Sequence, residues 1–593
     1  MSLASLLEVQ ESSPESPITA VLLHELARRN GIVISPHHEK AYLLGIQSTY
    51  AVAEKVNALP DYIDPRLHPV PVLGGFRKYR KPEPEQNALN AWRYIMDVRA
   101  AKPHSRVLEG RCFAFKDTIA IGNIPQSVGT FPQFLSDTGD YPCPQIDAII
   151  VQRLLLAGAT LAGISTCENY SLSPMSYTSA FGPVNNPWRR GYNSGGSSSG
   201  SAALVALGVA RDAGVEGLEA AGKDVTVAIG GDQAGSIRVP ASYCGVYGLK
   251  PTFGLVPYTG IAGLLPMIDY VGPMARTIED IALSLTVMAG YDGLDPRMSP
   301  ESPLRENVEQ YHDTVATFVR QVKDDRALPS TGPNLRIGMI TESFHIDGLS
   351  DEVAEVVRSA AIQHFTAMGA QVSEVSIPIH AAGAAIWTAA VRNQMASHAF
   401  GGRATDILTH DLPHLSPRWP PDQEMYDVLS SHNPAVILTA LGETLLTDPR
   451  LLPMCSQRKA HRHVLQLRAA YDEALLKFDV LVTPTTPTVA PPLPELNDAN
   501  ATNGPSGIDN PILKMLRMAA GSTNNTSPFN ATGHPALNVP CGWGTASNGV
   551  DKLPMGLQII GKRFDDTGVL KAAKLFELGG GGLGTRPASG CNK

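Results

Sequence analysis

The chain of 593 residues lacks the features that mark a membrane or secreted protein. No stretch approaches the roughly 18 uninterrupted apolar residues that a membrane-spanning helix needs. Residues 1–20 carry Glu8, Glu11 and Glu15 together with prolines, and no basic segment is followed by an apolar one, so they do not form a secretory signal. We therefore expect a cytoplasmic protein that has no membrane partner.

An excess of positive charge is also missing. The chain has 48 Lys and Arg residues against 56 Asp and Glu residues, a formal net charge of −8, so it offers no electrostatic basis for binding nucleic acid. Its seven cysteines are odd in number and show no CxxC spacing, which argues against a disulfide framework and a zinc site and favours a reducing compartment. With 43% hydrophobic and 18% charged residues, the chain is long enough for one large core and an appendage. A small-molecule partner fits this composition best.

Histidine is absent from the most glycine- and serine-rich part of the chain, residues 191–252. Apolar runs follow its two glycine-rich turns closely, which would not be the case in a flexible linker. A serine hydroxyl becomes a nucleophile only when a base removes its proton, and histidine and lysine are the usual bases. Lys116 ends an apolar run in FAFKDTIA, where burial would lower its pKa and supply the neutral amine that a base requires. The candidate nucleophiles are Ser197, Ser198, Ser199 and Ser236.

Apolar runs and helical periods alternate along most of the chain. The pattern predicts strands at 113–120, 161–164, 225–229, 335–340, 372–377 and 480–482. It predicts helices at 147–157, 202–209, 278–289, 351–368 and 456–478. Strands that alternate with helices predict an α/β fold, with a mixed central β-sheet covered by helices on both faces.

The N-terminal part of the chain follows a different pattern. Apolar residues at helical spacing predict two or three helices within 18–60, with Ser35 as the N-cap of the second. The segment 61–86 is proline-rich and carries a basic run from Arg77 to Lys81, which is typical of a solvated linker. We accordingly expect a small N-terminal α-helical module with its linker, a main catalytic domain and a flexible tail, at residues 1–86, 87–578 and 579–593.

Several motifs resemble those of the amidase signature hydrolases. They are FKDT at 115–118, GGSSSGSA at 195–202 and GGDQAGSIRVPASYCGVYGLKPTFGLVP at 230–257. They continue with NPW at 186–188, DYVGPMART at 269–277, AGYDGLDPR at 289–297, GHPALNVPCG at 533–542 and LPMGLQIIGK at 553–562. The similarity covers residues 95–575 and implies the amidase signature fold for this part. Within the family, the helical N-terminal segment and the letters GGDQ are similar to bacterial amidases of the nitrile-degrading kind.

The resemblance implies an amide hydrolase with a Ser-cisSer-Lys triad that needs no metal or other cofactor. By its place in the motifs, Ser236 would be the nucleophile and Lys116 the base. Ser197 would be the bridging serine, held after a cis peptide bond from Gly196, and would pass protons between the other two.

The resemblance also implies roles for residues around the triad. Ser198 and Asp232 have supporting places in the two turns, although an ordinary turn aspartate would fit Asp232 equally well. Trp387, in an apolar helix, is a candidate pocket wall, although a core position also suits it. An oxyanion hole would be formed by the backbone N–H groups of Gln233, Ala234, Gly235 and Ser236.

Two features depart from the family pattern. Ala234 stands where the family usually has glycine, and its methyl group would narrow the pocket. Ser197 and Ser236 are further apart in the sequence than in relatives, because of extra residues within 210–226 that we expect on the surface. The polar segment 504–530 is likewise expected to be a surface excursion.

Other motifs suggest different chemistry but lack the context they need. GSSSG at 196–200 fits the GxSxG nucleophile elbow, with Ser198 as nucleophile and His534 as its histidine, yet no apolar strand precedes it. SQRK at 456–459 fits the SxxK of β-lactamases without the accompanying KTG. His461 and His463 are two positions apart, and so lie on different helix faces.

The expected reaction is hydrolysis of the C–N bond of small carboxylic amides. A carbamate or ester hydrolase on the same site is the nearest alternative, because both substrates share the carbonyl geometry of an amide. The fold can also serve as the amide-hydrolysing component of a complex that charges transfer RNA, and a non-catalytic binding protein would not need the triad. The N-terminal module has more apolar positions than a short hairpin can bury, including Leu22, Leu26 and Tyr42, which predicts a homodimer with this module at the interface.

Overall fold

The computed structural model describes residues 16–218, 224–325, 334–404, 407–408, 412–416, 418–452, 456–494 and 510–587. The chain divides into two units, Met1–Pro65 and Arg66–Lys593. The described part of the first unit is helical, with α2 (Ala20–Arg29) and α3 (Pro36–Asn57). Ser35 precedes α3 as predicted, but its side chain makes no capping hydrogen bond, and Pro36 occupies the first helical position, which suits proline. Leu23 is buried, whereas Val33 is 96% exposed.

The boundary between the units lies near the start of the proline-rich segment 61–86, after Pro65, and not at its end. Arg77, which belongs to the basic run predicted as a solvated linker, is buried and pairs with both carboxylate oxygens of Asp147. The backbone N–H of Val70 donates to the same carboxylate at 2.9 Å. Residues 66–86 therefore belong to the second unit, because a buried ion pair and its hydrogen bonds hold them there.

The second unit is organised around a sheet of 12 strands in the order β1-β2-β4-β3-β7-β9-β8-β13-β14-β12-β10-β11. These strands are β1 (Tyr79–Arg80), β2 (Trp92–Val98), β3 (Cys112–Lys116), β4 (Thr160–Ser165), β7 (Val227–Asp232), β8 (Tyr247–Lys250), β9 (Tyr270–Ala275), β10 (Arg336–Ile340), β11 (Gln371–Val375), β12 (Val480–Pro484), β13 (Ala536–Thr545) and β14 (Lys552–Ile560). A separate pair consists of β5 (Asn185–Asn186) and β6 (Arg189–Asn193). Strand β3 runs parallel to β4 and β7, whereas β9 runs antiparallel to β7, so the sheet is mixed as predicted.

Helices cover both faces of this sheet, which confirms the predicted α/β fold. In β3, Phe113 and Phe115 pack in a hydrophobic cluster with α4, α7 and α17, whereas Ala114 packs in another with α5 and α6. Because successive strand residues point to opposite faces, these clusters lie on the two sides of the sheet.

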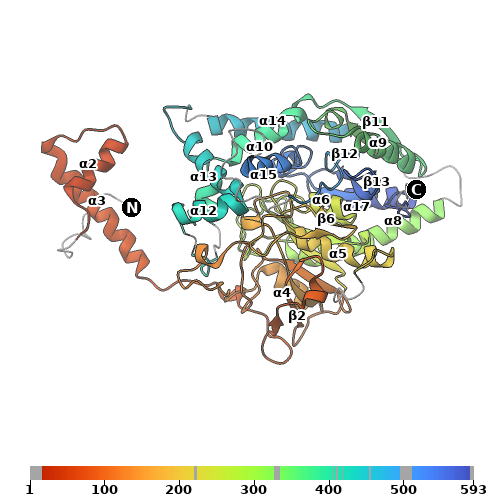
Figure 1. Ribbon diagram of the computed structural model, residues 1–593, viewed down its shortest axis with the longest axis horizontal. Coiled ribbons are helices and arrows are strands. Elements are labelled where there is room, and N and C mark those ends of the chain that lie inside the picture. The colour runs from red at the N-terminus through yellow and green to blue at the C-terminus, as the bar shows by residue number, and fades with distance from the viewer. Residues whose placement is uncertain are drawn as a thin grey trace. The chain divides into compact units, whose positions relative to one another are not determined.

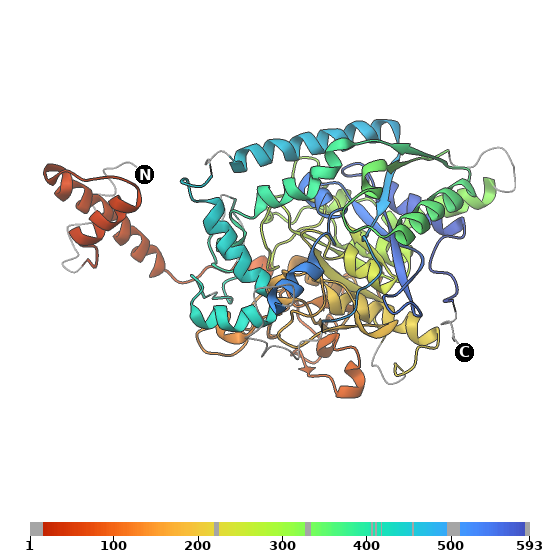
Figure 2. The same cartoon turned by 45° about the horizontal axis from the view of Figure 1, so that its top comes forward.

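Helix α10 packs beside the long helix α14, as both views show (Figures 1 and 2). The helices are α4 (Ile149–Leu156), α5 (Ser199–Asp212), α6 (Arg238–Cys244), α7 (Ile278–Met288), α8 (Tyr311–Asp325), α9 (Asp351–Thr366), α10 (Gly383–Val391), α11 (Met395–Ala399), α12 (Gln423–His432), α13 (Pro434–Leu446), α14 (Ser456–Lys477), α15 (Pro511–Ala519), α16 (Ser527–Thr532) and α17 (Asp566–Leu578).

The segment 504–530, expected to be a surface excursion, is buried in part: residues 525–530 lie in the core, whereas most of 510–521 is exposed or half-buried. Residues 510–530 form α15 and the start of α16, and Asn525, Thr526 and Asn530 are buried. Their amides and hydroxyl make hydrogen bonds inside the unit, which is why a polar sequence can be buried here. The expectation of a surface position is therefore wrong for these residues.

Two other segments expected to be exposed are partly packed. Ala210, at the start of the extra residues between the two serine turns, is buried in α5, while residues 219–223 lie outside the described ranges. In the tail, Arg586 donates a hydrogen bond to the Trp188 carbonyl oxygen at 3.1 Å, and residues 588–593 lie outside the described ranges. Within those ranges, no helix combines the length and the apolar character that crossing a membrane would require.

Candidate active site

Lys116 closes strand β3 on the face of the sheet that carries Ala114. It is fully buried, and its Nζ donates a hydrogen bond to Ser197 Oγ at 2.8 Å. Burial lowers the pKa of Lys116 to about 8, although nearby groups such as Cys167 and Asp232 act to raise it. The amine can therefore lose its proton near neutral pH, as predicted from its place in an apolar strand.

Ser197 lies two residues before the start of helix α5 and follows a cis peptide bond from Gly196, as the resemblance implied. The backbone is tightly packed here, because a Cβ atom at Gly196 would lie 2.5 Å from the carbonyl oxygen of Ser173. Ser198 Oγ donates to the Gly231 carbonyl at 3.2 Å, so this hydroxyl is held by the neighbouring strand. Ser197 is thus the serine of this turn that faces Lys116.

Ser236 lies on the turn between β7 and α6. It lines a cavity of about 280 Å³ and is 8% exposed, whereas Lys116 and Ser197 are fully buried. The two serine turns are joined by a hydrogen bond from the Ser198 N–H to the Ser236 carbonyl oxygen at 3.3 Å. Within the described residues no hydrogen bond links the hydroxyls of Ser197 and Ser236, so Ser236 Oγ remains open to the cavity.

Asp232 braces the turn that carries Ser236. Its carboxylate accepts hydrogen bonds from the backbone N–H groups of Gly235 at 2.7 Å and Ile237 at 3.1 Å, and pairs with the buried Arg238 at 2.9 Å. Burial acts to raise the pKa of Asp232, but the charge of Arg238 and the hydrogen bonds from Arg238 and Asn530 outweigh it and bring the pKa to about 2. The turn is therefore built on a permanently charged carboxylate that is fully paired.

Three of the four predicted oxyanion-hole donors are available. The N–H of Gly235 donates to Asp232, so this group is not free to bind substrate, contrary to the prediction. Within the described residues, the N–H groups of Gln233, Ala234 and Ser236 donate to no other group. Gly235 has a φ of +139°, and a Cβ atom there would lie 2.4 Å from Thr526 Oγ1, so the turn requires glycine at this position.

The cavity beside Ser236 has largely apolar walls. Trp387 lines it and donates its indole N–H to the Gln233 carbonyl oxygen at 3.0 Å, so this side chain both bounds the cavity and holds the nucleophile turn. Ala234, the residue that replaces the family's glycine, also lines the cavity. Further apolar surface comes from Leu172, Tyr177, Leu264, Leu438 and Met515.

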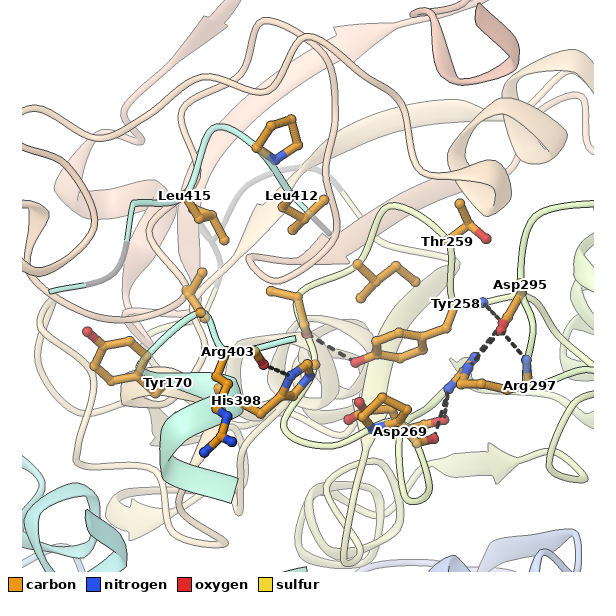
Figure 3. A pocket seen from close by; sticks show the side chains of 18 of the residues that line it. Tyr170, Tyr258, Thr259, Asp269, Asp295, Arg297, His398, Arg403, Leu412 and Leu415 are labelled. Carbon is orange, nitrogen blue, oxygen red and sulfur yellow. Dashed lines mark hydrogen bonds and ion pairs between the residues drawn. The ribbon is translucent and has the colours of Figure 1, made fainter. Parts of the chain in front are cut away.

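A second cavity, of about 330 Å³, is lined by the segment between β8 and β9 and contains no member of the triad (Figure 3). Figure 3 shows Asp295 facing Arg297, and the two form an ion pair at 2.6 Å. Tyr258 accepts a hydrogen bond from the Gln233 side-chain amide at 3.0 Å and donates to a backbone carbonyl. Tyr258, in the wall of this cavity, therefore holds the side chain of Gln233, the first residue of the turn that carries Ser236.

Three further residues hold the site and were not identified from the sequence. Arg238 lies in the motif GSIRVP, and a charged residue among apolar neighbours could have indicated a buried ion pair. Glu168 accepts a hydrogen bond from Ser199 Oγ at 2.8 Å, and burial raises its pKa to about 7. Asn530 donates to Asp232 at 2.9 Å from a distant part of the chain, and its local sequence gives no sign of this contact.

The rival motifs are not assembled into sites. The ring nitrogens of His534 contact Thr532 at 3.0 Å and Asp472 at 3.1 Å, not Ser198, so the nucleophile-elbow alternative fails. His461 contacts a backbone carbonyl and His463 contacts Gln466. Neither histidine lines the cavity that Ser236 lines.

A family model and several known proteins are similar to this chain. The amidase family model matches residues 85–570. The enantioselective amidase of Rhodococcus rhodochrous is 34% identical over 509 residues, which cover 84% of this chain and 85% of that protein. A glutamyl-tRNA(Gln) amidotransferase subunit of Methanosarcina barkeri is 31% identical over 481 residues, which cover 80% of this chain and 85% of that protein. Among solved structures, the native peptide amidase of Stenotrophomonas maltophilia matches with a TM-score of 0.54 at 25% identity, over 82% of this chain and 85% of the other.

The matched residues include both serine turns and the strand that carries Lys116. They also span most of the sheet described above. The chain therefore belongs to the amidase signature family, whose enzymes hydrolyse amides.

Proposed function

We propose that the chain hydrolyses the C–N bond of small carboxylic amides, releasing the acid and ammonia or an amine, through an acyl-enzyme on Ser236. The observation that carries this proposal is the 2.8 Å hydrogen bond between Lys116 Nζ and Ser197 Oγ, beside a turn whose Ser236 opens into a cavity. A buried lysine with a lowered pKa, a bridging serine and an open serine are the three groups that such chemistry needs.

In the first half-reaction, neutral Lys116 accepts a proton from Ser197 as Ser197 accepts the proton of Ser236. Ser236 Oγ then attacks the carbonyl carbon, and a tetrahedral oxyanion forms. The free N–H groups of Gln233, Ala234 and Ser236 stabilise it, each typically by about 3–4 kcal/mol. When the C–N bond breaks, the proton on Lys116 returns through Ser197 to the leaving nitrogen, and the acyl group stays on Ser236.

In the second half-reaction, water replaces the departed amine. The same relay takes a proton from water, the resulting hydroxide attacks the acyl ester, and the carboxylic acid leaves as Ser236 regains its proton. Asp232 and Ser198 support both steps indirectly, because they hold the two serine turns in place.

The size and walls of the cavity favour a compact substrate with apolar surface. Carbamates and esters present the same carbonyl group and are the nearest alternatives. A set of amides, carbamates and esters of matched chain length, compared by kcat/KM, tests the choice. We expect the amides to be the best substrates; a higher kcat/KM for the carbamates would make the enzyme a carbamate hydrolase, and no turnover in the whole set would refute the proposal.

A second candidate function comes from the relatives named as components of amidotransferases. In that case the chain would release ammonia for use by a partner protein. If the chain is a self-sufficient amidase, the purified chain alone should release ammonia from a simple amide, and adding a second protein should not increase the rate. A strict requirement for a second protein would favour the amidotransferase function.

We further propose that the chain works in the cytoplasm as a homodimer. Cys112, Cys143, Cys167, Cys244 and Cys541 are free thiols, in keeping with a reducing compartment. In the first unit, Val21 is 79% and Tyr42 is 58% exposed, and a second copy would cover such apolar surface.

A further inference from the structure

Arg392 is the single charged residue among the described residues that line the Ser236 cavity. It caps the C-terminal end of α10, and the other lining side chains are apolar or neutral. Arg392 is partly buried, and a guanidinium in such a wall gains from a partner, because an unpaired charge away from water is costly. The identity of that partner therefore bears on what the cavity binds.

The described part of the protein supplies only a weak partner. Nη1 of Arg392 donates to Thr439 Oγ1 at 3.2 Å, and Nε is buried without any hydrogen-bond partner. Among the described residues no Asp or Glu side chain forms an ion pair with Arg392, and burial lowers its pKa with no opposing carboxylate. The guanidinium nevertheless keeps its proton at neutral pH.

The nearest acidic residue on the facing helix is already engaged. Glu443 lies one turn beyond Thr439 on α13, and its carboxylate accepts the backbone N–H groups of Ala396 at 2.7 Å and Ser397 at 3.1 Å. These hydrogen bonds cap the N-terminus of α11. The Glu443 carboxylate is therefore engaged there and does not pair with Arg392.

We propose that Arg392 binds a carboxylate on the substrate, so that the preferred substrates are monoamides of dicarboxylic acids. This inference rests on the proposed amide hydrolysis at Ser236 and names its substrate class. A carboxylate would satisfy the unpartnered Nε and bring the missing negative charge, and the planar guanidinium can bind it through two parallel hydrogen bonds. The apolar walls of the cavity between Ser236 and Arg392 would contact the methylene chain of the substrate.

The positions of Trp387 and Arg392 on helix α10 indicate how long the methylene chain of the substrate should be. Trp387 bonds to the Gln233 carbonyl at the nucleophile turn, and Arg392 lies five positions further along the same helix. At about 1.5 Å per residue this places the Cα atom of Arg392 roughly 7–8 Å further along the helix axis than that of Trp387. An acyl chain of several methylene groups can span such a distance, whereas a two-methylene chain is too short.

The test compares adipamate with hexanamide, which have the same chain length but differ in the terminal carboxylate. The wild-type enzyme should show a kcat/KM at least tenfold higher for adipamate, and succinamate should show no such advantage over butanamide. In Arg392→Met the ratio of adipamate to hexanamide should fall at least tenfold, and Arg392→Lys should retain part of the preference. Arg418→Met, a change at an exposed arginine outside the cavity, should leave the ratio unaltered.

Because the ratio is taken within one preparation, partial misfolding of a variant does not affect it. A wild-type ratio of one or less, or an unaltered ratio in Arg392→Met, overturns the inference. If neither amide is hydrolysed, the proposed function fails, and calorimetric binding of adipamate and hexanamide then decides the role of Arg392. Tighter adipamate binding that is lost in Arg392→Met supports the site, and equal binding of the two amides refutes it.

Discussion

The proton balance of the proposed reaction depends on one buried residue, Lys116. Its pKa of about 8 lies below the ordinary lysine value of 10.5, and only the neutral amine can act as the base. We therefore predict that kcat/KM rises with pH through about 8 and then levels off. Lys116→Ala should cost several orders of magnitude in kcat. A pH-independent rate from acid to alkaline conditions would be incompatible with the lysine base.

Lys116→Arg provides a control for charge at this position. Arginine keeps a cation next to Ser197 but cannot be deprotonated in a protein. If Lys116 acted only through its charge, Lys116→Arg would retain activity. We expect it to be as inactive as Lys116→Ala, with both proteins folded by circular dichroism.

The ion pair of Asp232 with Arg238 is the second feature that single substitutions can test. Both side chains are fully buried, so Asp232→Ala leaves an unpaired charge in the core. Loss of one partner from a buried pair typically costs about 3–5 kcal/mol, and we expect a decrease of this size in the free energy of unfolding by urea. Asp448→Ala, which removes the partner of the exposed Arg450, is the matched control and should leave the midpoint unaltered. Equal stability of the two variants would contradict the bracing role of Asp232.

At the residue scale, local motifs point to the candidate groups of the site but not to the contacts around them. Lys116, Ser197 and Ser236 could be located because their motifs are local. The use of the Gly235 N–H by Asp232, and the support from Asn530, could not be predicted. They depend on how segments far apart in the chain meet, and no local pattern records that.

At the scale of elements, strands with short apolar runs such as β4, β10 and β12 were predicted, whereas β2, β8, β9, β13 and β14 were missed. Strand β10 and helices α7 and α9 lie close to their predicted ranges, whereas β3 ends at Lys116, four residues before its predicted end. Strand β9 was missed, because Gly272 and Pro273 resemble a turn. A Cβ atom at Gly272 would lie 2.1 Å from the Leu249 carbonyl oxygen, so the glycine serves a close approach of two strands and does not mark a turn.

The turn between β7 and α6 gives a prediction at this scale. Gly235→Ala places a methyl group 2.4 Å from Thr526 Oγ1 at a φ of +139°, where side chains are strained. We expect a fall in kcat of at least tenfold and a lower melting temperature. Gly442→Ala, in α13 with no atom within 4 Å of the added methyl, should leave activity intact and not destabilise the protein. A fully active Gly235→Ala variant would show that the turn tolerates a side chain.

At the scale of the whole molecule, the homodimer proposal concerns the helical first unit. A unit of this size buries too little apolar surface to be stable by itself, and Val21, Val33 and Tyr42 remain exposed in it. We predict that the full-length chain is a dimer and that a chain starting at Arg66 is a monomer. Light scattering on both measures this. A monomeric full-length chain, or a dimer that survives the truncation, would refute the role of the first unit.

The central claim is that an acyl group is carried on Ser236 during amide hydrolysis. The most direct test is rapid acid quenching of the wild-type enzyme during turnover of an amide, followed by mass spectrometry of its peptides. We predict that the peptide containing Ser236 gains the mass of the acyl group, that Ser236→Ala gives neither adduct nor turnover, and that Ser284→Ala, a buried serine on α7, behaves like the wild type. An adduct on Ser198 or another residue, or turnover by a folded Ser236→Ala enzyme, would contradict the account.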